Sequence, residues 1–111
     1  MTVTRDDGSV VCERCEVART AFQRTKGLLG KRELPRGEGL LIQRTSSIHM
    51  FFMRFPIDAV FVDRDLVVRK VVRDLKPWRM AFAFGAKWVL ELPAGEAERR
   101  RVVAGQQLVL S

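Results

Sequence analysis

The sequence predicts a mainly β protein: a single compact β-sandwich or jelly-roll-like domain with one or two short helices. Two observations support this prediction. Short apolar runs follow one another along the chain, and turn-forming residues separate them at intervals of about eight to twelve residues. The length of 111 residues favours one domain, which we expect to cover residues 1–111. Residues 1–9 are polar and predict a loosely held, flexible end.

Most of the predicted strands are apolar runs bounded by turn residues. Over residues 87–92, Lys-Trp-Val-Leu-Glu-Leu, side chains alternate as in a half-buried strand. Asp63-Arg64-Asp65 predicts a hairpin turn between strands at 57–62 and 66–72. Pro56 should end the preceding apolar run because proline lacks a ladder donor. Further strands are expected at residues 10–12, 15–18, 40–42, 48–53 and 108–110.

The clearest helix signal starts at Thr20. Thr20 and Gln23 have capping-box spacing, and Gly30 ends the segment. A helix of ten residues or fewer is stable only when it packs on a larger body, which should be the sheet. A second short helical turn is expected at residues 96–101, where an acidic start and a basic end suit the helix dipole.

Composition narrows the class of protein. The chain is 47% hydrophobic and 30% charged, as in globular proteins. No apolar run is long enough to span a membrane, and the first residues lack the apolar stretch of a secretory signal, so we expect a cytoplasmic protein. The net charge of +7 is compatible with an anionic partner such as nucleic acid or a membrane surface. The basic residues are spread along the chain, however, and most are expected to form a solvated face.

Several strings, taken together, resemble a known family. The most specific are Phe52-Met53-Arg54-Phe55-Pro56-Ile57-Asp58 and Val89-Leu90-Glu91-Leu92-Pro93-Ala94-Gly95. In this order they resemble the bacterial and archaeal domain of unknown function 192 (DUF 192) family, from about residue 17 to residue 110. The resemblance implies a compact, mostly β, sandwich-like domain and no established activity. The chain departs from the family pattern at Arg101, where a Gly is usual, and at Gly105-Gln106, where Gly-Asp is usual.

Two polar residues interrupt apolar runs. Asp58 follows Ile57, and a buried carboxylate must be paired or hydrogen-bonded. In one interpretation, Asp58 accepts backbone N–H groups or meets an Arg and so holds a strand end in place. In the other, it is a site carboxylate in an apolar wall. His49, the only histidine, is either a satisfied core residue or a polar group in a pocket. A His49–Asp58 pair would suit acid–base catalysis, but no Ser or Cys nucleophile motif accompanies it.

A second group of candidates follows Leu75. Trp78 and Arg79 lie in a predicted loop and offer a flat face and a guanidinium fork; the alternative is a Trp lid over the sheet edge. Met80, Phe82 and Phe84 alternate with smaller residues, which predicts an edge strand or an apolar flap. If exposed, these side chains would form a contact surface.

Cys12 and Cys15 have CxxC spacing, a weak signal when it occurs once. Structural zinc needs four ligands, and this chain could add only His49. A copper site that also used Met50 and Met53 would have suitably soft ligands. We predict no metal and no cofactor, while thiol or redox use of the pair stays open.

These observations favour a non-enzymatic binding module. Its ligand would be a small molecule or an extended peptide, held in a groove of the β-sandwich. The predicted ligand-binding residues are His49, Met53, Asp58, Trp78 and Arg79. Two alternatives remain: a nucleic-acid-binding protein with an Arg-rich face, and an uncharacterised enzyme that uses His49 and Asp58. The sequence predicts no particular oligomeric state.

Overall fold

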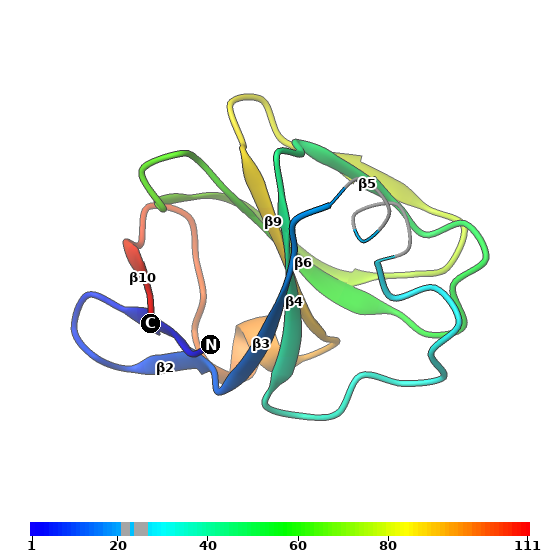
Figure 1. Cartoon of the computed structure of the whole chain (residues 1–111), viewed down its shortest axis with the longest axis horizontal. Coiled ribbons are helices and arrows are strands. Elements are labelled where there is room, and N and C mark those ends of the chain that lie inside the picture. The colour runs from blue at the N-terminus through cyan, green and yellow to red at the C-terminus, as the bar shows by residue number, and fades with distance from the viewer. Residues whose placement is uncertain (21–22, 24–26) are drawn as a thin grey trace.

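The computed structural model describes residues 1–20, 23 and 27–111, and the fold is mainly β, as the sequence predicts. A central sheet has five strands in the order β3-β4-β9-β6-β7. A three-stranded sheet, β10-β1-β2, lies to one side of it, and a ribbon of β5 and β8 lies to the other (Figure 1). The elements are β1 (Val3–Arg5), β2 (Val10–Cys12), β3 (Arg14–Ala18), β4 (Glu38–Gln43), β5 (Ser47–His49), β6 (Ile57–Val62), β7 (Val68–Leu75), β8 (Met80–Phe82), β9 (Trp88–Pro93), α2 (Glu96–Arg99) and β10 (Leu108–Leu110).

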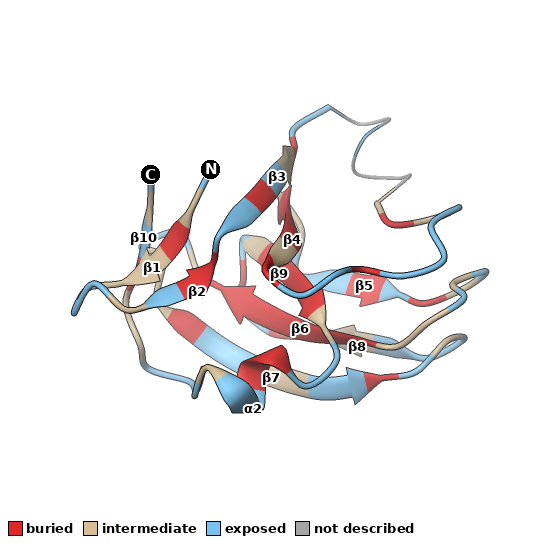
Figure 2. Cartoon of the chain, turned by 90° about the horizontal axis from the view of Figure 1, so that it is seen from below, coloured by how far each residue is buried: buried red, intermediate tan, exposed pale blue. Residues whose placement is uncertain are grey.

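The middle strands of the central sheet, β4, β9 and β6, are buried on both faces. All six residues of β6 are buried, and successive ones point to opposite sides. Ala59 and Phe61 belong to the core cluster on the side of the ribbon, whereas Val60 and Val62 belong to the cluster on the side of β1 and α2. Figure 2 shows β6 in the colour of buried residues. Two-sided burial explains why β6 is a continuous apolar run rather than an alternating one.

Most predicted strands are present, with shifted ends. The Asp63 turn is confirmed: its carboxylate accepts the Asp65 and Val67 N–H groups, and β6 and β7 pair antiparallel across it. The short helical turn is confirmed as α2. Arg101, which stands where the DUF 192 pattern usually has Gly, has a φ of 56°, in the left-handed region that glycine favours.

Two segments differ from the prediction. Residues 1–9, expected to be loosely held, contain β1, which pairs with both β2 and β10 and buries Val3 completely. The run over residues 48–53 remains a strand only to His49, because the Met53 N–H bonds the Met50 carbonyl and closes a turn.

The predicted helix after Thr20 falls largely outside the described residues. The capping box itself is present: the Gln23 N–H donates to Thr20 Oγ1 at 3.0 Å, and the Thr20 N–H donates to Gln23 Oε1 at 3.2 Å. Among the described residues, no helix is long and apolar enough to cross a membrane.

Candidate functional site

The ribbon of β5 and β8 has one side toward the core and one toward solvent. Ile48 pairs with Ala81, and both pack in or against the ribbon-side core cluster. The neighbouring pair, His49 and Met80, points the other way and is exposed. Phe82, two residues after Met80, is exposed as well. The period of two along β8 therefore places apolar side chains on the solvent side.

Three tight turns next to the ribbon carry aromatic side chains at central positions. A hydrogen bond of 3.2 Å closes each of them, between residues 50 and 53, 76 and 79, and 83 and 86. Phe52 and Trp78 occupy the third positions of their turns with φ of 66° and 71°. In the last turn, Phe84 precedes Gly85, whose φ is 83°. A third turn position with positive φ normally takes glycine or asparagine, because a side chain there costs about 1–2 kcal/mol.

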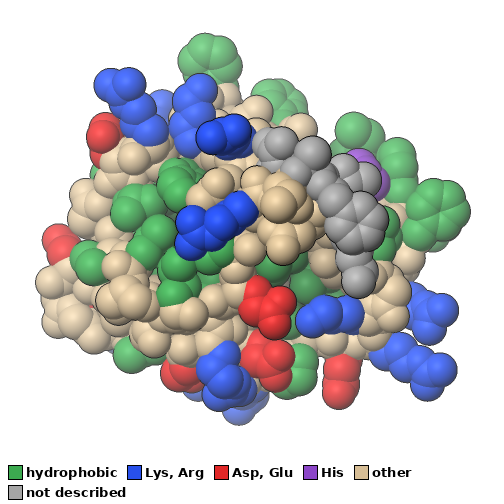
Figure 3. Space-filling view, in the orientation of Figure 1, with side chains coloured by type: hydrophobic (Ala, Val, Ile, Leu, Met, Phe, Trp, Pro, Cys, Tyr) green, Lys and Arg blue, Asp and Glu red, His purple; other side chains and the backbone are tan. Residues whose placement is uncertain are grey.

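The side chains on these turns and on β8 form one exposed surface. Phe84 is 91% exposed, and the least exposed of the five, Trp78, is still 59% exposed. We call this the aromatic surface; its members are Phe52, Trp78, Met80, Phe82 and Phe84. The Phe52 and Trp78 rings lie 4.9 Å apart. In the space-filling view, hydrophobic side chains project along the upper right edge of the molecule, with His49 among them (Figure 3).

The two chain segments that build this surface contain no acidic residue. Residues 39–57 and 75–90 include five Lys or Arg residues and neither Asp nor Glu. Only one of the five, Lys76, has an ion pair among the described residues, with Asp74 at 3.1 Å. A single-sign charge distribution of this kind favours an anionic partner.

Cations from β7 lie against the same surface. The Lys70 ammonium stands 5.6 Å from the centre of the Phe82 ring and donates to the Phe82 carbonyl at 2.9 Å. The Arg69 guanidinium lies against Gly85, 3.3 Å from where a Cβ would stand. A shallow hollow of about 520 Å³ lies between Phe82, Phe84, Arg69 and Lys70, with Gly105 on its far side.

The structure brings three of the five predicted site residues together. His49 stacks on Phe51 at 4.8 Å, and Phe51 lies 5.9 Å from Trp78. Arg79 is exposed beside Trp78, and its carbonyl accepts the Met50 N–H at 2.7 Å. Met53 instead packs against the ribbon-side core cluster.

The fifth predicted residue, Asp58, has no exposed surface. Its Oδ1 accepts the Asp74 N–H at 2.8 Å, and its Oδ2 accepts the N–H groups of Gly95 and Ala97 at 3.0 and 2.9 Å. Asp58 thus fixes a bulge of β7 and satisfies the first N–H groups of α2, which would otherwise lack partners. The interpretation of Asp58 as an acceptor of backbone N–H groups is confirmed, and we leave it out of the candidate site.

His49 and Asp58 do not form an acid–base pair. The Asp58 oxygens bond the backbone groups described above, and His49 Nδ1 accepts the Phe51 N–H at 3.3 Å on the molecular surface. A general acid–base pair needs direct contact or one bridging water, and a carboxylate with zero exposure offers neither to a surface imidazole.

The two cysteines lie together but are enclosed. Cys12 and Cys15 are 0% and 3% exposed. The interaction between the two neighbouring thiols lowers the pKa of Cys12 and, together with burial, raises the pKa of Cys15. Met50 and Met53 lie with the core cluster on the opposite face of the central sheet, so the four soft ligands do not meet. In residues 1–20, 23 and 27–111, no three His, Cys, Asp or Glu side chains cluster as metal ligands would.

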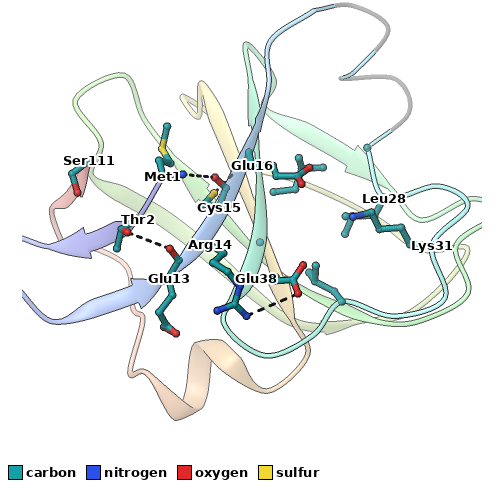
Figure 4. A pocket seen from close by; sticks show the side chains of 14 residues that line it. Met1, Thr2, Glu13, Arg14, Cys15, Glu16, Leu28, Lys31, Glu38 and Ser111 are labelled. Atoms are coloured by element: carbon teal, nitrogen blue, oxygen red, sulfur yellow. Dashed lines mark hydrogen bonds and ion pairs between the residues drawn. The ribbon is translucent and has the colours of Figure 1, made fainter.

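Cys15 lines a pocket of about 400 Å³ beside β3 (Figure 4). The Met1 ammonium donates to the Cys15 carbonyl at 3.0 Å, and Arg14 meets Glu38 at 3.9 Å across the rim. The charges at this rim pair with one another, whereas residues 39–57 and 75–90, which carry the aromatic surface, contain no acidic residue. We therefore take the aromatic surface as the candidate site.

One buried carboxyl was missed by the sequence reasoning. Glu91 was expected on the solvent side of a half-buried strand, but it is only 5% exposed. It pairs with Leu40 on one neighbouring strand and Ala59 on the other. Burial raises the pKa of Glu91 to about 8. Because the ribbon side of the central sheet is covered, the side of β9 expected to face water lies in the core.

The fold and the site define a mainly β protein with an aromatic, cation-rich surface on a two-stranded ribbon. Residues 2–110 match the model of DUF192, described as an uncharacterised family, and the chain belongs to that family. A UPF0127 protein of Thermococcus sibiricus is 32% identical to it, over 97% of this chain and 73% of the relative.

Solved structures agree with this assignment. A protein of unknown function from Novosphingobium aromaticivorans has a TM-score of 0.85 and 30% identity, and the match covers 98% of this chain and 82% of that one. A protein from Sinorhizobium meliloti has a TM-score of 0.84 at 23% identity, covering 97% of this chain and 89% of that one, and shows the fold alone.

Proposed function

We propose that this protein is a non-enzymatic binding module that holds an anionic ligand with flat or apolar groups on the aromatic surface. One observation carries the proposal: the five most exposed large apolar side chains of the described residues gather on a part of the chain that has cations and no acids. Aromatic faces supply burial on binding, and the cations select for negative charge.

The residues of the proposed site would have different roles in binding. Phe52 and Trp78, in contact at 4.9 Å, would form an apolar contact at one end of the surface. Phe82 and Phe84 would hold the ligand at the other end, beside the hollow lined by Lys70. Arg79 is exposed and directly follows Trp78 in the sequence, and it would pair with an anionic group. In place of the groove expected from the sequence, the proposed site is an open surface with one shallow hollow.

A second copy of the chain is a poorer occupant of the surface. Two aromatic surfaces brought face to face would set Arg79 and Lys70 of one copy near the same cations of the other. Like charges in an interface oppose association unless an anion separates them. The charge of the surface therefore favours a partner of opposite sign.

A thermal-shift screen tests the proposal. The probes are acidic peptides, aromatic phosphates and carboxylates, oligonucleotides and anionic vesicles, each at two salt concentrations. A ligand at 100 times its Kd adds about 2.7 kcal/mol, a rise in Tm of roughly 10 °C for a domain of this size.

Substitutions test whether a rise in Tm caused by a probe comes from binding at the aromatic surface. Trp78→Ala combined with Phe82→Ala should abolish it. Val103→Ala is the matched control, because Val103 is an apolar side chain that is 47% exposed and lies outside the aromatic surface. The proposal fails when no probe raises the Tm, or when the rise survives the double substitution.

A further inference from the structure

We infer that the anionic partner of the aromatic surface is a single-stranded nucleic acid, whose bases stack on the exposed rings and whose phosphates pair with the nearby cations. This inference rests on the proposed function and names the chemical class of its ligand. It follows from the closeness of rings and cations in this part of the molecule.

Rings and cations lie near one another in this part of the molecule. Trp78 is followed directly by Arg79. The Lys70 ammonium lies 5.6 Å from the Phe82 ring centre. The Arg69 guanidinium lies against Gly85, the residue after Phe84, where an added Cβ would be 3.3 Å from it. One cation, Lys70, thus lies over a ring, while Arg79 adjoins Trp78 along the chain and Arg69 lies next to the residue after Phe84 and also meets Asp63 at 3.9 Å. A polymer with one flat base and one negative phosphate per unit matches rings and cations that lie close together.

The spacing of the side chains suits a linear ligand. Met80 and Phe82 are two residues apart on β8 and therefore about 7 Å apart on the same side. Phe84 continues the row beyond the end of the strand, and Trp78 precedes it. A row of this kind can contact successive units of an extended chain. A duplex would not use the rings, because its bases are stacked on one another and closed to side-chain stacking.

A lipid surface accounts less well for the same features. A membrane-inserting surface keeps its apolar tips free and its cations at the rim. Here Lys70 bonds the Phe82 carbonyl at 2.9 Å and lies over the Phe82 ring, so the charge lies within the apolar row. Insertion of Phe82 into hydrocarbon would carry that ammonium with it, at a cost that binding to a phosphate polymer avoids.

The primary test is fluorescence anisotropy with a labelled oligothymidylate of about 12 nucleotides, within the span of known single-strand sites. Affinity should fall as salt rises, with a slope of about −2 in log–log form for three phosphate contacts on a single strand. Phe82→Ala and Trp78→Ala should each weaken binding by about 10-fold, as expected for the loss of one stacked base. Arg79→Gln should weaken binding and flatten the salt slope, whereas Val103→Ala and Arg64→Gln should change neither.

A tryptophan fluorescence titration tests for a base at Trp78 without relying on a measured affinity. Trp78 and Trp88 are the only two tryptophans of the chain, so Trp88→Phe leaves Trp78 as the sole reporter. Stacking of a base on Trp78 should quench its emission in proportion to the bound fraction. The same titration with duplex DNA of equal length and with phosphatidylserine vesicles gives the comparison.

The outcomes separate this inference from the proposed function. Absence of oligothymidylate binding at low salt, equal affinity for duplex DNA, or an affinity unchanged by Phe82→Ala would each overturn the inference. If acidic peptides or vesicles instead bind in a manner that Trp78→Ala abolishes, the binding function stands and the nucleic-acid assignment falls. If no probe of any class depends on Trp78 or Phe82, both fall.

Discussion

Glu91 makes the stability of this protein sensitive to alkali, and Glu91→Gln should remove that sensitivity. Burial raises the pKa of Glu91 from 4.5 to about 8. Between these two pH values the folded state keeps a proton that the unfolded state has lost. The free energy of unfolding therefore falls as the pH rises through this window.

The magnitude follows from the size of the shift. At about 1.4 kcal/mol per pKa unit, the loss of stability relative to acid pH is roughly 3 kcal/mol at pH 7 and roughly 5 kcal/mol above pH 8. That is a large part of the 5–15 kcal/mol typical of a whole domain. Glutamine has nearly the same shape and cannot ionise, so Glu91→Gln should resemble the wild type near pH 5 and exceed it by several kcal/mol at pH 9.

Urea unfolding at pH 5, 7 and 9, followed by tryptophan fluorescence, measures the effect. The quantity compared is the free energy of unfolding of the variant minus that of the wild type. The contributions of the other carboxyl groups cancel in this difference. Glu16→Gln, an exposed position on β3, is the matched control and should show a constant difference. Parallel pH profiles for the wild type and Glu91→Gln would show that the Glu91 carboxyl is not held protonated, and would refute the reasoning.

Three further predictions concern the backbone. Asp58→Asn removes a charged acceptor of three N–H groups and should lower the free energy of unfolding by about 3 kcal/mol or more, measured by urea denaturation. Gly39→Ala should destabilise by about 1–3 kcal/mol, because its Cβ would stand 2.9 Å from Cys12 Sγ and 3.0 Å from the Glu91 carbonyl; a stability equal to wild type would contradict the packing described. Trp78→Gly should be more stable than Trp78→Ala by about 1 kcal/mol, since only glycine adopts a φ of 71° without strain.

Much of the fold was predictable because burial leaves a readable pattern. The apolar run at 57–62 predicted a strand, and β6 is one; its burial on both faces, seen in the structure, explains why the run does not alternate. Burial on both faces also explains why Glu91 was wrongly expected to face solvent. An alternating sequence shows which residues share a side of a strand, but not whether that side meets water. β1 was missed because a single buried residue, Val3, anchors a polar segment between two partner strands.

The site was predictable in part. Trp78, Arg79 and His49 were identified as unusual residues, and the alternation from Met80 to Phe84 indicated a contact surface. The absence of acids over residues 39–57 and 75–90 is visible in the sequence, but it becomes informative only when β5 and β8 are known to pair. Asp58 could not be separated from a site residue, because its backbone partners come from segments 16 to 39 residues away.

The left-handed backbone of Phe52 and Trp78 had no signal in the sequence, and it bears most directly on function. Each position would be less strained with glycine, and each ring is mostly exposed, so neither gains core burial in return. The cations of the same two segments repel one another without acids to neutralise them. Left-handed backbone also occurs at Arg44, Leu66, Asp74 and Arg101, but at Phe52 and Trp78 it coincides with charge repulsion, and the two are independent costs of folding. A partner that covers the rings and neutralises the cations would offset both, because stacking recovers the apolar area and anionic groups remove the repulsion.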